Sequence, residues 1–422
     1  MTPVFRFSII LARRHHEQPA GDGIRPVSGS LGWPAGVDPS TNTPHLHTIA
    51  MSQARFTRRR RNLIARIRKL GLPALLVTDE SNVTWLTGFT GDSSYLLIGP
   101  KLGVLVSDTR YTVQIAEECS GLDVEIRDAR RPMHDAIATV TTAAKLGALG
   151  FEAHSTSMAT WERISAAIAG SNGGPELVSV GMVVNELRAK KDSGEIAEIR
   201  LAVHQAERGF AAMVSVLEAD KTELEVAHEL EHLMRRFGAE GPAFEPIVAV
   251  GPRAALPHAR PGPTLIGESG FVLFDWGAKT TGGYRSDLTR VLLTSKIPPK
   301  LEAIYGVVLN AQRKGIKAIR PGATLKSVDR AARRVIENAG YGKFFGHGLG
   351  HGIGLDIHEE PRFSPVAEGV LEPGMVITVE PGIYLPGWGG VRIEDDVLVT
   401  RDGHEVLTSV PKRFEDAVVQ IA

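Results

Sequence analysis

The sequence predicts an α/β N-terminal domain followed by an α+β C-terminal domain that is built from a duplicated helix–strand unit. The 422 residues are too many for one ordinary domain and suffice for two, each with its own core. Short apolar runs alternate with helical patterns in the first half, which is typical of an α/β layer arrangement. In the second half two predicted helices precede a group of strands, and the same order then occurs again, although the two halves share little side-chain identity.

Composition and charge are those of a soluble globular protein. Apolar residues make up 43% of the chain and charged residues 23%, and the 48 basic and 48 acidic residues give no net charge. This balance does not favour nucleic acid or a membrane surface as a partner, and no apolar run has the length of a membrane span. The single cysteine, Cys119, excludes an internal disulfide and a thiolate zinc site, and it fits a reducing, cytoplasmic setting.

The first part of the chain differs from the rest, because it is rich in Pro, Gly, Ser, Thr and His and has little periodicity. We expect residues 1–54 to be a disordered extension, or to include residues upstream of a natural start at Met51. A weak export signal is a third interpretation. The apolar run 5–12 is a poor signal peptide, because Arg6 and Ser8 interrupt it and no small-residue cleavage site is evident.

The first domain is placed at residues 55–185. Its opening helix runs from Phe56 to Gly71, because apolar residues recur three and four positions apart before the glycine. We interpret the basic run Arg58–Arg61 on this helix as a solvent-facing surface rather than a nucleic-acid patch. The other predicted elements are strands at 73–78, 95–98, 104–107, 124–127 and 146–151, and helices at 108–119 and 132–145.

The second domain is placed at residues 193–415, after a polar and basic linker at 185–192. Two helices open it, and each begins with the spacing of a capping box. The two boxes are Asp192 with Glu195 and Thr222 with Glu225. The elements that follow are strands at 247–250, 270–274 and 288–293, helices at 301–319 and 325–338, and strands at 376–380 and 391–399.

The stretch from Gly346 to His358 (GHGLGHGIGLDIH) is the most unusual in the chain. Glycine occupies every second position from Gly346 to Gly354, although each glycine loses much backbone freedom on folding. In a strand these glycines would share one face and let another backbone or a ligand approach closely. The opposite face would then carry His347, Leu349, His351 and Ile353.

Four carboxylates stand at or near the ends of predicted strands. An aspartate directly after the apolar run 271–274 is costly to bury unless it is paired or bound to a metal. Two Asp, two Glu and one His form a hard, oxygen-rich set that suits two divalent cations roughly 3.5–4 Å apart. Such a pair deprotonates a bound water and polarises a carbonyl. The carboxylates are Asp275, Asp287, Glu380 and Glu394.

These motifs together resemble the metallopeptidases with the "pita-bread" fold, the group of methionyl aminopeptidase, Xaa-Pro aminopeptidase and Xaa-Pro dipeptidase. The resemblance covers about residues 55–415. YLLI at 95–98 and SDTRY at 107–111 are similar to the creatinase-like N-terminal domain of the proline-specific branch. In the second half the matching motifs are Asp275 to Asp287, His347 to His358, EPGIY at 380–384 and VRIE at 391–394.

The resemblance implies a metal ligand at each of five positions, namely Asp275, Asp287, His351, Glu380 and Glu394. By the family pattern Asp287 and Glu394 bridge the two metals. Asp275 completes one metal site, and His351 with Glu380 completes the other. Glu380 would also accept a proton from the attacking water, which acts as a hydroxide that bridges the metals.

The resemblance also implies roles for residues that do not bind metal. His258 would stabilise the tetrahedral intermediate or the leaving group, and His347 would line the pocket for the residue after the scissile bond. His358 would form a hydrogen bond near the scissile bond and help to stabilise the transition state. Tyr384 and Arg392 match positions that shape the substrate pocket.

The family resemblance implies a two-metal exopeptidase that removes an N-terminal residue preceding proline. We favour an Xaa-Pro aminopeptidase over an Xaa-Pro dipeptidase. Two rival hypotheses are a metal-free hydrolase of creatinase type and a non-catalytic peptide-binding protein of the same fold. We expect Mn²⁺ as the metal, although Co²⁺, Zn²⁺ and Fe²⁺ suit the same ligands. The expected partners are a peptide with proline at its second position and a second copy of the chain.

One spacing departs from the family pattern. Asp275 and Asp287 are twelve positions apart, whereas the family usually has eleven. We expect a β-bulge near Thr280–Gly283 to absorb the additional residue. Without such a correction the alternation of faces would slip by one and Asp287 would point away from the other ligands.

Overall fold

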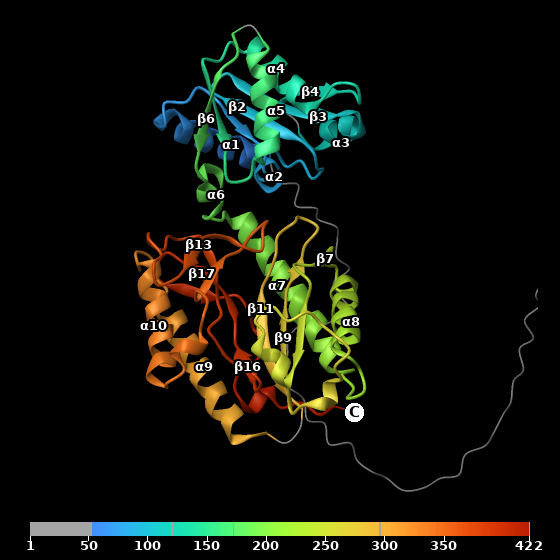
Figure 1. Ribbon diagram of the computed structural model, residues 1–422, viewed down its shortest axis with the longest axis vertical. Coiled ribbons are helices and arrows are strands. Elements are labelled where there is room, and N and C mark those ends of the chain that lie inside the picture. The colour runs from blue at the N-terminus through green and yellow to red at the C-terminus, as the bar shows by residue number, and fades with distance from the viewer. Residues whose placement is uncertain (1–52, 120, 172, 295–296, 422) are drawn as a thin grey trace, which may run out of the picture. The chain divides into compact units, whose positions relative to one another are not determined.

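Figure 1 shows the computed structural model, which describes residues 53–119, 121–171, 173–294 and 297–421. The expectations for residues 1–54 and for a start at Met51 lie outside the described residues, except that Gln53 and Ala54 already belong to the first helix. The described residues fall in one compact unit. Within these ranges, no helix has both the length and the apolar character needed to cross a membrane.

The first domain is a six-stranded mixed sheet with helices on both faces. Its strands are β1 (Leu75–Val77), β2 (Tyr95–Gly99), β3 (Leu102–Asp108), β4 (Asp123–Arg127), β5 (Ala148–Glu152) and β6 (Glu176–Val180). Its helices are α1 (Gln53–Lys69), α2 (Glu80–Thr87), α3 (Thr112–Glu118), α4 (Met133–Ala143), α5 (Met158–Ala169) and α6 (Val183–Arg188). The strand order is β4-β3-β2-β1-β5-β6, and β1 pairs antiparallel with β2 and parallel with β5.

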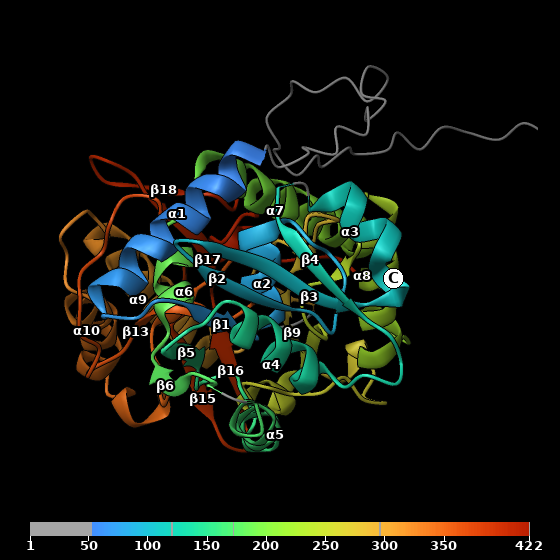
Figure 2. The same ribbon diagram turned by 90° about the horizontal axis from the view of Figure 1, so that it is seen from above.

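Alternation along β1 explains why both faces of this sheet are covered. Leu75 and Val77 pack with residues of α1, α2 and α3, whereas Leu76 between them packs with residues of α4 and α5. Figure 2 shows α1 and α5 on opposite sides of the sheet. The predicted strands and helices of this domain are therefore confirmed, although α2, α5 and β6 were not predicted. β6 leaves most of its residues partly exposed and so lacks a strong apolar pattern.

The prediction that the basic run Arg58–Arg61 faces solvent is wrong for Arg59. That side chain is only 3% exposed, and it forms ion pairs with Asp192 at 3.1 Å and with Glu195 at 2.8 Å. Because Asp192 caps the N-terminus of the next domain's first helix, Arg59 attaches α1 to the start of that helix.

The segment 185–192, which we interpreted as a polar linker, is also more ordered than expected. The helix α6 occupies its first part, and Arg188 and Lys191 are buried. Both cations bind Glu359, which lies far along the chain. Basic residues are therefore present here because they pair with a buried carboxylate and not because the segment is solvated. The domain limits 55–185 and 193–415 stay a prediction.

The second domain contains two helix pairs, a three-stranded sheet, a five-stranded sheet and two strand pairs. The helices are α7 (Ser193–Val214), α8 (Glu223–Arg236), α9 (Pro299–Ala318) and α10 (Leu325–Asn338). The strands of its first part are β7 (Gly241–Pro242), β8 (Ile247–Val250), β9 (Phe271–Trp276), β10 (Ala278–Lys279) and β11 (Leu288–Leu293). Those of its second part are β12 (Gly350–Gly352), β13 (Glu359–Phe363), β14 (Val376–Val379), β15 (Gly382–Leu385), β16 (Gly389–Arg392), β17 (Asp395–Val399) and β18 (His404–Val406).

Each helix pair covers one sheet, as the predicted duplication requires. α7 and α8 pack against the sheet β11-β9-β8, and α9 and α10 pack against the sheet β13-β12-β14-β17-β18 and the pair β15-β16. Figure 1 shows the two helix pairs on the outside of the strands. Both predicted capping boxes are present, at Asp192 and at Thr222. The predicted strand 391–399 is wrong in one respect, because it divides into β16 and β17 with Glu394 between them.

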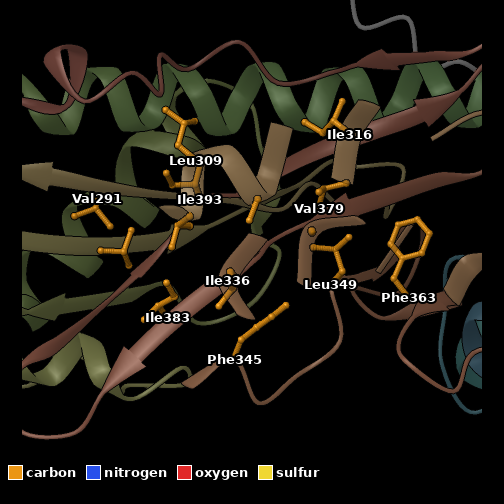
Figure 3. Close-up of a cluster of buried hydrophobic side chains, with 14 of the residues drawn as sticks. Val291, Leu309, Ile316, Ile336, Phe345, Leu349, Phe363, Val379, Ile383 and Ile393 are labelled. Carbon is orange, nitrogen blue, oxygen red and sulfur yellow. The ribbon is translucent and has the colours of Figure 1, made fainter. Parts of the chain in front are cut away.

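A hydrophobic cluster beneath α9 and α10 fixes the backbone next to two predicted ligands (Figure 3). Val379 precedes Glu380 and Ile393 precedes Glu394, and both apolar side chains are fully buried. Complete burial of such a side chain contributes about 1.5–3 kcal/mol. Movement of either carboxylate away from its position would therefore disturb the core.

The glycine-rich stretch forms a shorter strand than the sequence predicts. β12 spans only Gly350–Gly352, and its pairing with β13 shifts register between His351 and Gly352. Leu349 and Ile353 pack in two different hydrophobic clusters. The predicted single face that carries all four side chains is therefore wrong, because the bulge interrupts the alternation.

The alternating glycines admit the protein's own backbone. A Cβ atom would lie 2.2 Å from the Phe363 carbonyl oxygen at Gly348, and 2.0 Å from the Thr378 carbonyl oxygen at Gly350. These oxygens belong to β13 and β14, which flank β12. The expected close approach is confirmed, and at Gly348 and Gly350 the atoms that approach belong to the protein's own backbone.

We predict that Gly350→Ala lowers the free energy of unfolding by about 2 kcal/mol or more, because the central strand β14 has no room to retreat. Urea unfolding measures this change. Gly346→Ala is the matched control, since a Cβ there meets no atom within 4 Å, and its effect should stay within about 0.5 kcal/mol. Equal unfolding midpoints for the two variants would contradict the packing role.

Candidate metal centre

All ten predicted site residues line one pocket of about 1180 Å³. The five predicted ligands come from strand ends on both sheets of the second domain. The sheets meet because Asp275 on β9 lies opposite Thr289 on β11, and Thr289 forms a bridge with Glu394. His351 lies on β12, and Glu380 follows β14 directly.

Asp287 faces this pocket despite the additional residue in its hairpin. The pairing of β9 with β11 keeps one register, from Trp276 opposite Leu288 to Lys279 opposite Arg285. The predicted bulge near Thr280–Gly283 is therefore wrong, and the additional residue lies in the turn that closes these strands. Gly283 permits this turn because its φ of 84° is unfavourable for other residues.

Five donor side chains converge at the floor of the pocket. Ligand atoms of Asp287, His351 and Glu394 all lie within 4.8 Å of one another. The Nε2 atom of His351 lies 3.7 Å from Asp287 Oδ2 and 3.4 Å from Glu380 Oε1. The negative charge of Asp275 contributes to the raised pKa of each of the other three carboxyls.

Four buried carboxylates repel one another strongly when all are ionised. Burial and the charge of Glu394 raise the pKa of Asp287 well above its usual range, and burial and Glu380 do the same for the pKa of Glu394. Burial raises the pKa of Glu380 to about 8, and Arg392 opposes this shift. Burial, assisted by His358, lowers the pKa of His351 to about 3 and so keeps its imidazole in the neutral form that binds metals.

Two buried oxygen atoms test whether the pocket fits metal ions. Asp275 Oδ1 and Glu394 Oε1 have no hydrogen-bond partner in the described part of the chain. An unsatisfied buried acceptor costs about 1–3 kcal/mol, and more when it is charged. Divalent cations would satisfy both oxygens and offset the repulsion, and oxygen atoms with one imidazole suit such ions. The residues present therefore fit a pair of divalent cations.

Arg392 and Tyr384 form a hydrogen-bonded chain behind the ligand Asp275. Arg392 donates from Nη2 to Asp275 Oδ2 at 2.5 Å and from Nη1 to the Tyr384 hydroxyl at 2.8 Å. That hydroxyl lies 3.0 Å from His347 Nε2. Arg392 is only 2% exposed, so it supports a ligand from behind. Its predicted contact with substrate stays a prediction.

The sequence did not reveal the two threonines that orient ligands. The Thr289 hydroxyl donates to Glu394 Oε2 at 2.6 Å, and the Thr378 hydroxyl lies 3.3 Å from Glu380 Oε1. Thr378 stands two residues before Glu380, and Thr289 stands two residues after Asp287, so each shares a face with a ligand of its own segment. Thr289 reaches Glu394 through the bridge between their backbones. That alternation is the signal from which they were predictable.

The three histidines that do not belong to the ligand set lie on the walls of the same pocket. The rings of His358 and His351 are 4.5 Å apart in an edge-to-face arrangement. His258 and His358 are exposed, whereas His347 is partly buried against Phe345. Burial, assisted by Arg392, lowers the pKa of His347 to about 4. The structure brings these residues together, and their individual roles stay predictions.

Arg362 is a further pocket residue that sequence reasoning did not select. It lies opposite His351 in the pairing of β12 with β13, so both side chains share one face. Its side chain is exposed, and its charge contributes to the lowered pKa of His358. It forms no ion pair within the described ranges.

Known families match both halves of the chain. Residues 197–401 match the metallopeptidase family M24, and residues 59–190 match the creatinase/prolidase N-terminal domain. The uncharacterized peptidase YqhT of Bacillus subtilis is 38% identical over 346 residues, which cover 82% of this chain and 96% of that protein. The chain belongs to metallopeptidase family M24.

Solved structures support the assignment of this chain to family M24. An Xaa-Pro dipeptidase from Bacillus anthracis superposes with a TM-score of 0.81 at 36% identity, and the match covers 87% of this chain and 100% of that one. An X-Pro aminopeptidase from Thermotoga maritima MSB8 gives 0.75 at 36% identity, covering 84% and 100%. The predicted creatinase-like domain and pita-bread catalytic domain are thus confirmed, as is the prediction that the chain is a metallopeptidase.

We predict that the metal-free M24 peptidase loses stability between pH 6.5 and pH 8.5. The pKa of Glu380 is about 8 in the folded chain against an ordinary value of 4.5. A carboxyl with a raised pKa favours the folded state while it is protonated, and this contribution is lost as it ionises. The raised pKa values of Asp287 and Glu394 also make the folded state less stable as the pH rises. The lowered pKa values of His347 and His351 change the stability only below about pH 6.5.

Thermal unfolding of chelator-treated protein measures this effect. Added Mn²⁺ should raise the melting temperature more at pH 8.5 than at pH 6.5, because bound cations remove the repulsion. Glu380→Gln should reduce the pH dependence, whereas Glu186→Gln at an exposed ion pair should leave it unchanged. A metal-free protein that is more stable at pH 8.5 would contradict the prediction.

Proposed function

We propose that this chain is a dinuclear-metal exopeptidase that hydrolyses the N-terminal Xaa-Pro bond of peptides, as an Xaa-Pro aminopeptidase. The convergence of five metal-compatible donors with three histidines in one pocket carries this proposal. Two similar proteins of known structure, an Xaa-Pro dipeptidase and an X-Pro aminopeptidase, support proline specificity. Mn²⁺ as the metal, a homodimer and a cytoplasmic setting stay predictions from the sequence.

The proposed metal ligands are Asp275, Asp287, His351, Glu380 and Glu394. Divalent cations held by these residues would lower the pKa of a water and would polarise the scissile carbonyl. Glu380 Oε1 lies 3.4 Å from His351 Nε2, so its carboxylate lies among the residues that would hold the cations. We assign to Glu380 the transfer of the water's proton to the leaving nitrogen.

The proposed oxyanion and leaving-group contacts come from His358 and His258. Each imidazole carries at least one N–H donor in either protonation state. Both rings are exposed in the pocket, and that of His358 lies against the ligand His351. Donors placed beside the metals stabilise charge that develops on the carbonyl oxygen.

The proposed proline contact is His347. A peptide bond to proline lacks an N–H, and its ring is apolar and rigid, so it suits a flat and uncharged wall. Tyr384 fixes one nitrogen of His347, and the other lies 2.8 Å from the Gly348 carbonyl oxygen. Both ring nitrogens are thus engaged, which leaves the ring plane to face the substrate.

The size of the pocket favours an aminopeptidase, and one residue favours a dipeptidase. At about 1180 Å³ the pocket exceeds the roughly 300–1,000 Å³ of common small-molecule sites, so a longer peptide has room. Arg362 favours an Xaa-Pro dipeptidase, because its exposed guanidinium on the His351 face suits a free carboxylate after proline.

The deciding experiment compares Ala-Pro with Ala-Pro-Xaa peptides, with and without Mn²⁺. An aminopeptidase should release alanine from the longer peptides at least as fast as from the dipeptide. Hydrolysis of Ala-Pro alone would establish the dipeptidase. Absence of hydrolysis of both by protein that holds fewer than one divalent ion per chain after Mn²⁺ loading would overturn the proposal.

Glu380→Ala should reduce kcat by about 10³-fold or more, because it removes a ligand and the proton acceptor together. Steady-state assays at saturating Mn²⁺ measure the loss. Glu368→Ala, at an exposed position outside the pocket, is the control and should retain full activity. Turnover above a few per cent of wild type would refute the role assigned to Glu380.

His347→Ala should raise KM for proline-containing substrates about tenfold and leave the bound metal nearly unchanged. The reason is that His347 contacts Tyr384 and the pocket, whereas His351 lies among the carboxylates. Metal analysis and kinetics are performed on the same sample. If the variant loses its metal, the assignments of His347 and His351 are interchanged.

A further inference from the structure

We propose that Arg188 is a positioning residue, which fixes the loop that carries His358 and connects this loop to the first domain. The proposal rests on the proposed function, because the position of His358 matters for activity only if the pocket is the active site. It also gives a reason for the basic segment 185–192, which the metal centre does not use.

One guanidinium binds the residues on both sides of His358. Arg188 donates from Nη2 to Asp356 Oδ2 at 2.7 Å and to Glu359 Oε1 at 2.5 Å. The Arg188 side chain is 2% exposed and that of Glu359 is 6% exposed, so the bond between them is shielded from water, whereas Asp356 is partly exposed. Asp356, two residues before His358, and Glu359, one residue after it, therefore bind the same buried cation.

The loop is folded around the Glu359 carboxylate. Lys191 donates to Glu359 Oε2 at 2.9 Å, and the amide of Asp356 donates to Oε1 at 3.1 Å. Burial alone would raise the pKa of Glu359, but Arg188 and Lys191 outweigh burial and lower it to about 2. A Cβ at Gly354 would lie 2.6 Å from the same carboxylate, so the glycine admits it.

The other terminal nitrogen of the Arg188 guanidinium binds a residue of the first domain. Arg188 Nη1 donates to Asn82 Oδ1 at 2.7 Å, and Asn82 Nδ2 donates to Glu152 Oε1, also at 2.7 Å. Glu152 is the last residue of β5, and its Oε2 accepts a hydrogen bond from the Thr78 amide at 2.9 Å. Ser81 reaches the loop directly, because its hydroxyl donates to Asp356 Oδ1 at 2.6 Å.

The imidazole of His358 depends on this support. Its ring contacts the His351 ring, and no hydrogen bond to the ring is found within the described part of the chain. The backbone between Asp356 and Glu359 therefore determines where the ring lies. A displacement of about 1 Å in a reacting group costs up to about 10²-fold in rate. Arg188 thus acts on the reaction through His358.

Two variants test this with bound metal measured alongside. Ser81→Ala removes one hydrogen bond outside the pocket and should lower kcat for the best Xaa-Pro peptide about 3- to 10-fold. Arg188→Lys keeps the charge but lacks the fork that spans Asp356 and Glu359, and it should lower kcat about 10²-fold. Arg66→Lys, at an exposed ion pair with Glu186, is the matched control and should not change kcat.

A double-mutant cycle with His358→Ala separates positioning from general damage. In that background Ser81→Ala should have no further effect on kcat, because the group through which it acts is absent. The same factor of loss with and without His358, or a loss that only follows the folded or metal-loaded fraction, would overturn the proposal. If Arg188→Lys does not fold, Ser81→Ala decides the outcome.

A readout without turnover distinguishes this proposal from the proposed function. If the wild-type protein hydrolyses no Xaa-Pro peptide, the proposed function fails. The ¹⁵N signals of the His358 ring in the metal-free protein then test positioning alone. They should shift in Ser81→Ala but not in Arg66→Lys, and unchanged signals in both would refute the role of Arg188.

Discussion

Repulsion among four buried carboxylates is the constraint on which the candidate site depends. Asp275, Asp287, Glu380 and Glu394 share one pocket with a single buried arginine, Arg392, so the protein itself does not neutralise them. The raised pKa values of three of these acids express that imbalance. A chain that folds around such a cluster needs rigid supports, and it needs cations from solution to reach full stability near neutral pH.

The supports are the apolar strands that end at the ligands. Val379 and Ile393 are buried in one hydrophobic cluster, and the carboxylates that follow them stand where the core stops (Figure 3). The glycines of β12 serve the same end, because they let that strand pack closely against its neighbours and so hold His351 between them. Ligands placed on strand ends in this way are positioned before a metal arrives, which favours a defined coordination geometry.

Patterns that arise within a short window were predictable from the sequence, and partnerships across the chain were not. The helices α9 and α10 and both capping boxes depend on neighbouring residues, and each was predicted correctly. The pairing of Arg188 with Glu359 spans 171 residues, so nothing local reveals it. The glycines of β12 illustrate the limit: their spacing signals a close approach, but only the pairing with β13 and β14 shows what approaches.

A comparison of buried acids within this chain shows why the pocket suits metal ions. Glu359 has Arg188 and Lys191 beside it, and Asp395 has Arg290 and Lys412, and the pKa of each of these carboxyls is lowered despite burial. The fold thus supplies two cations for each of these two carboxyls. Asp287 and Glu394 are equally buried, and neither forms an ion pair with a lysine or an arginine in the described part of the chain, so divalent cations would balance their charge.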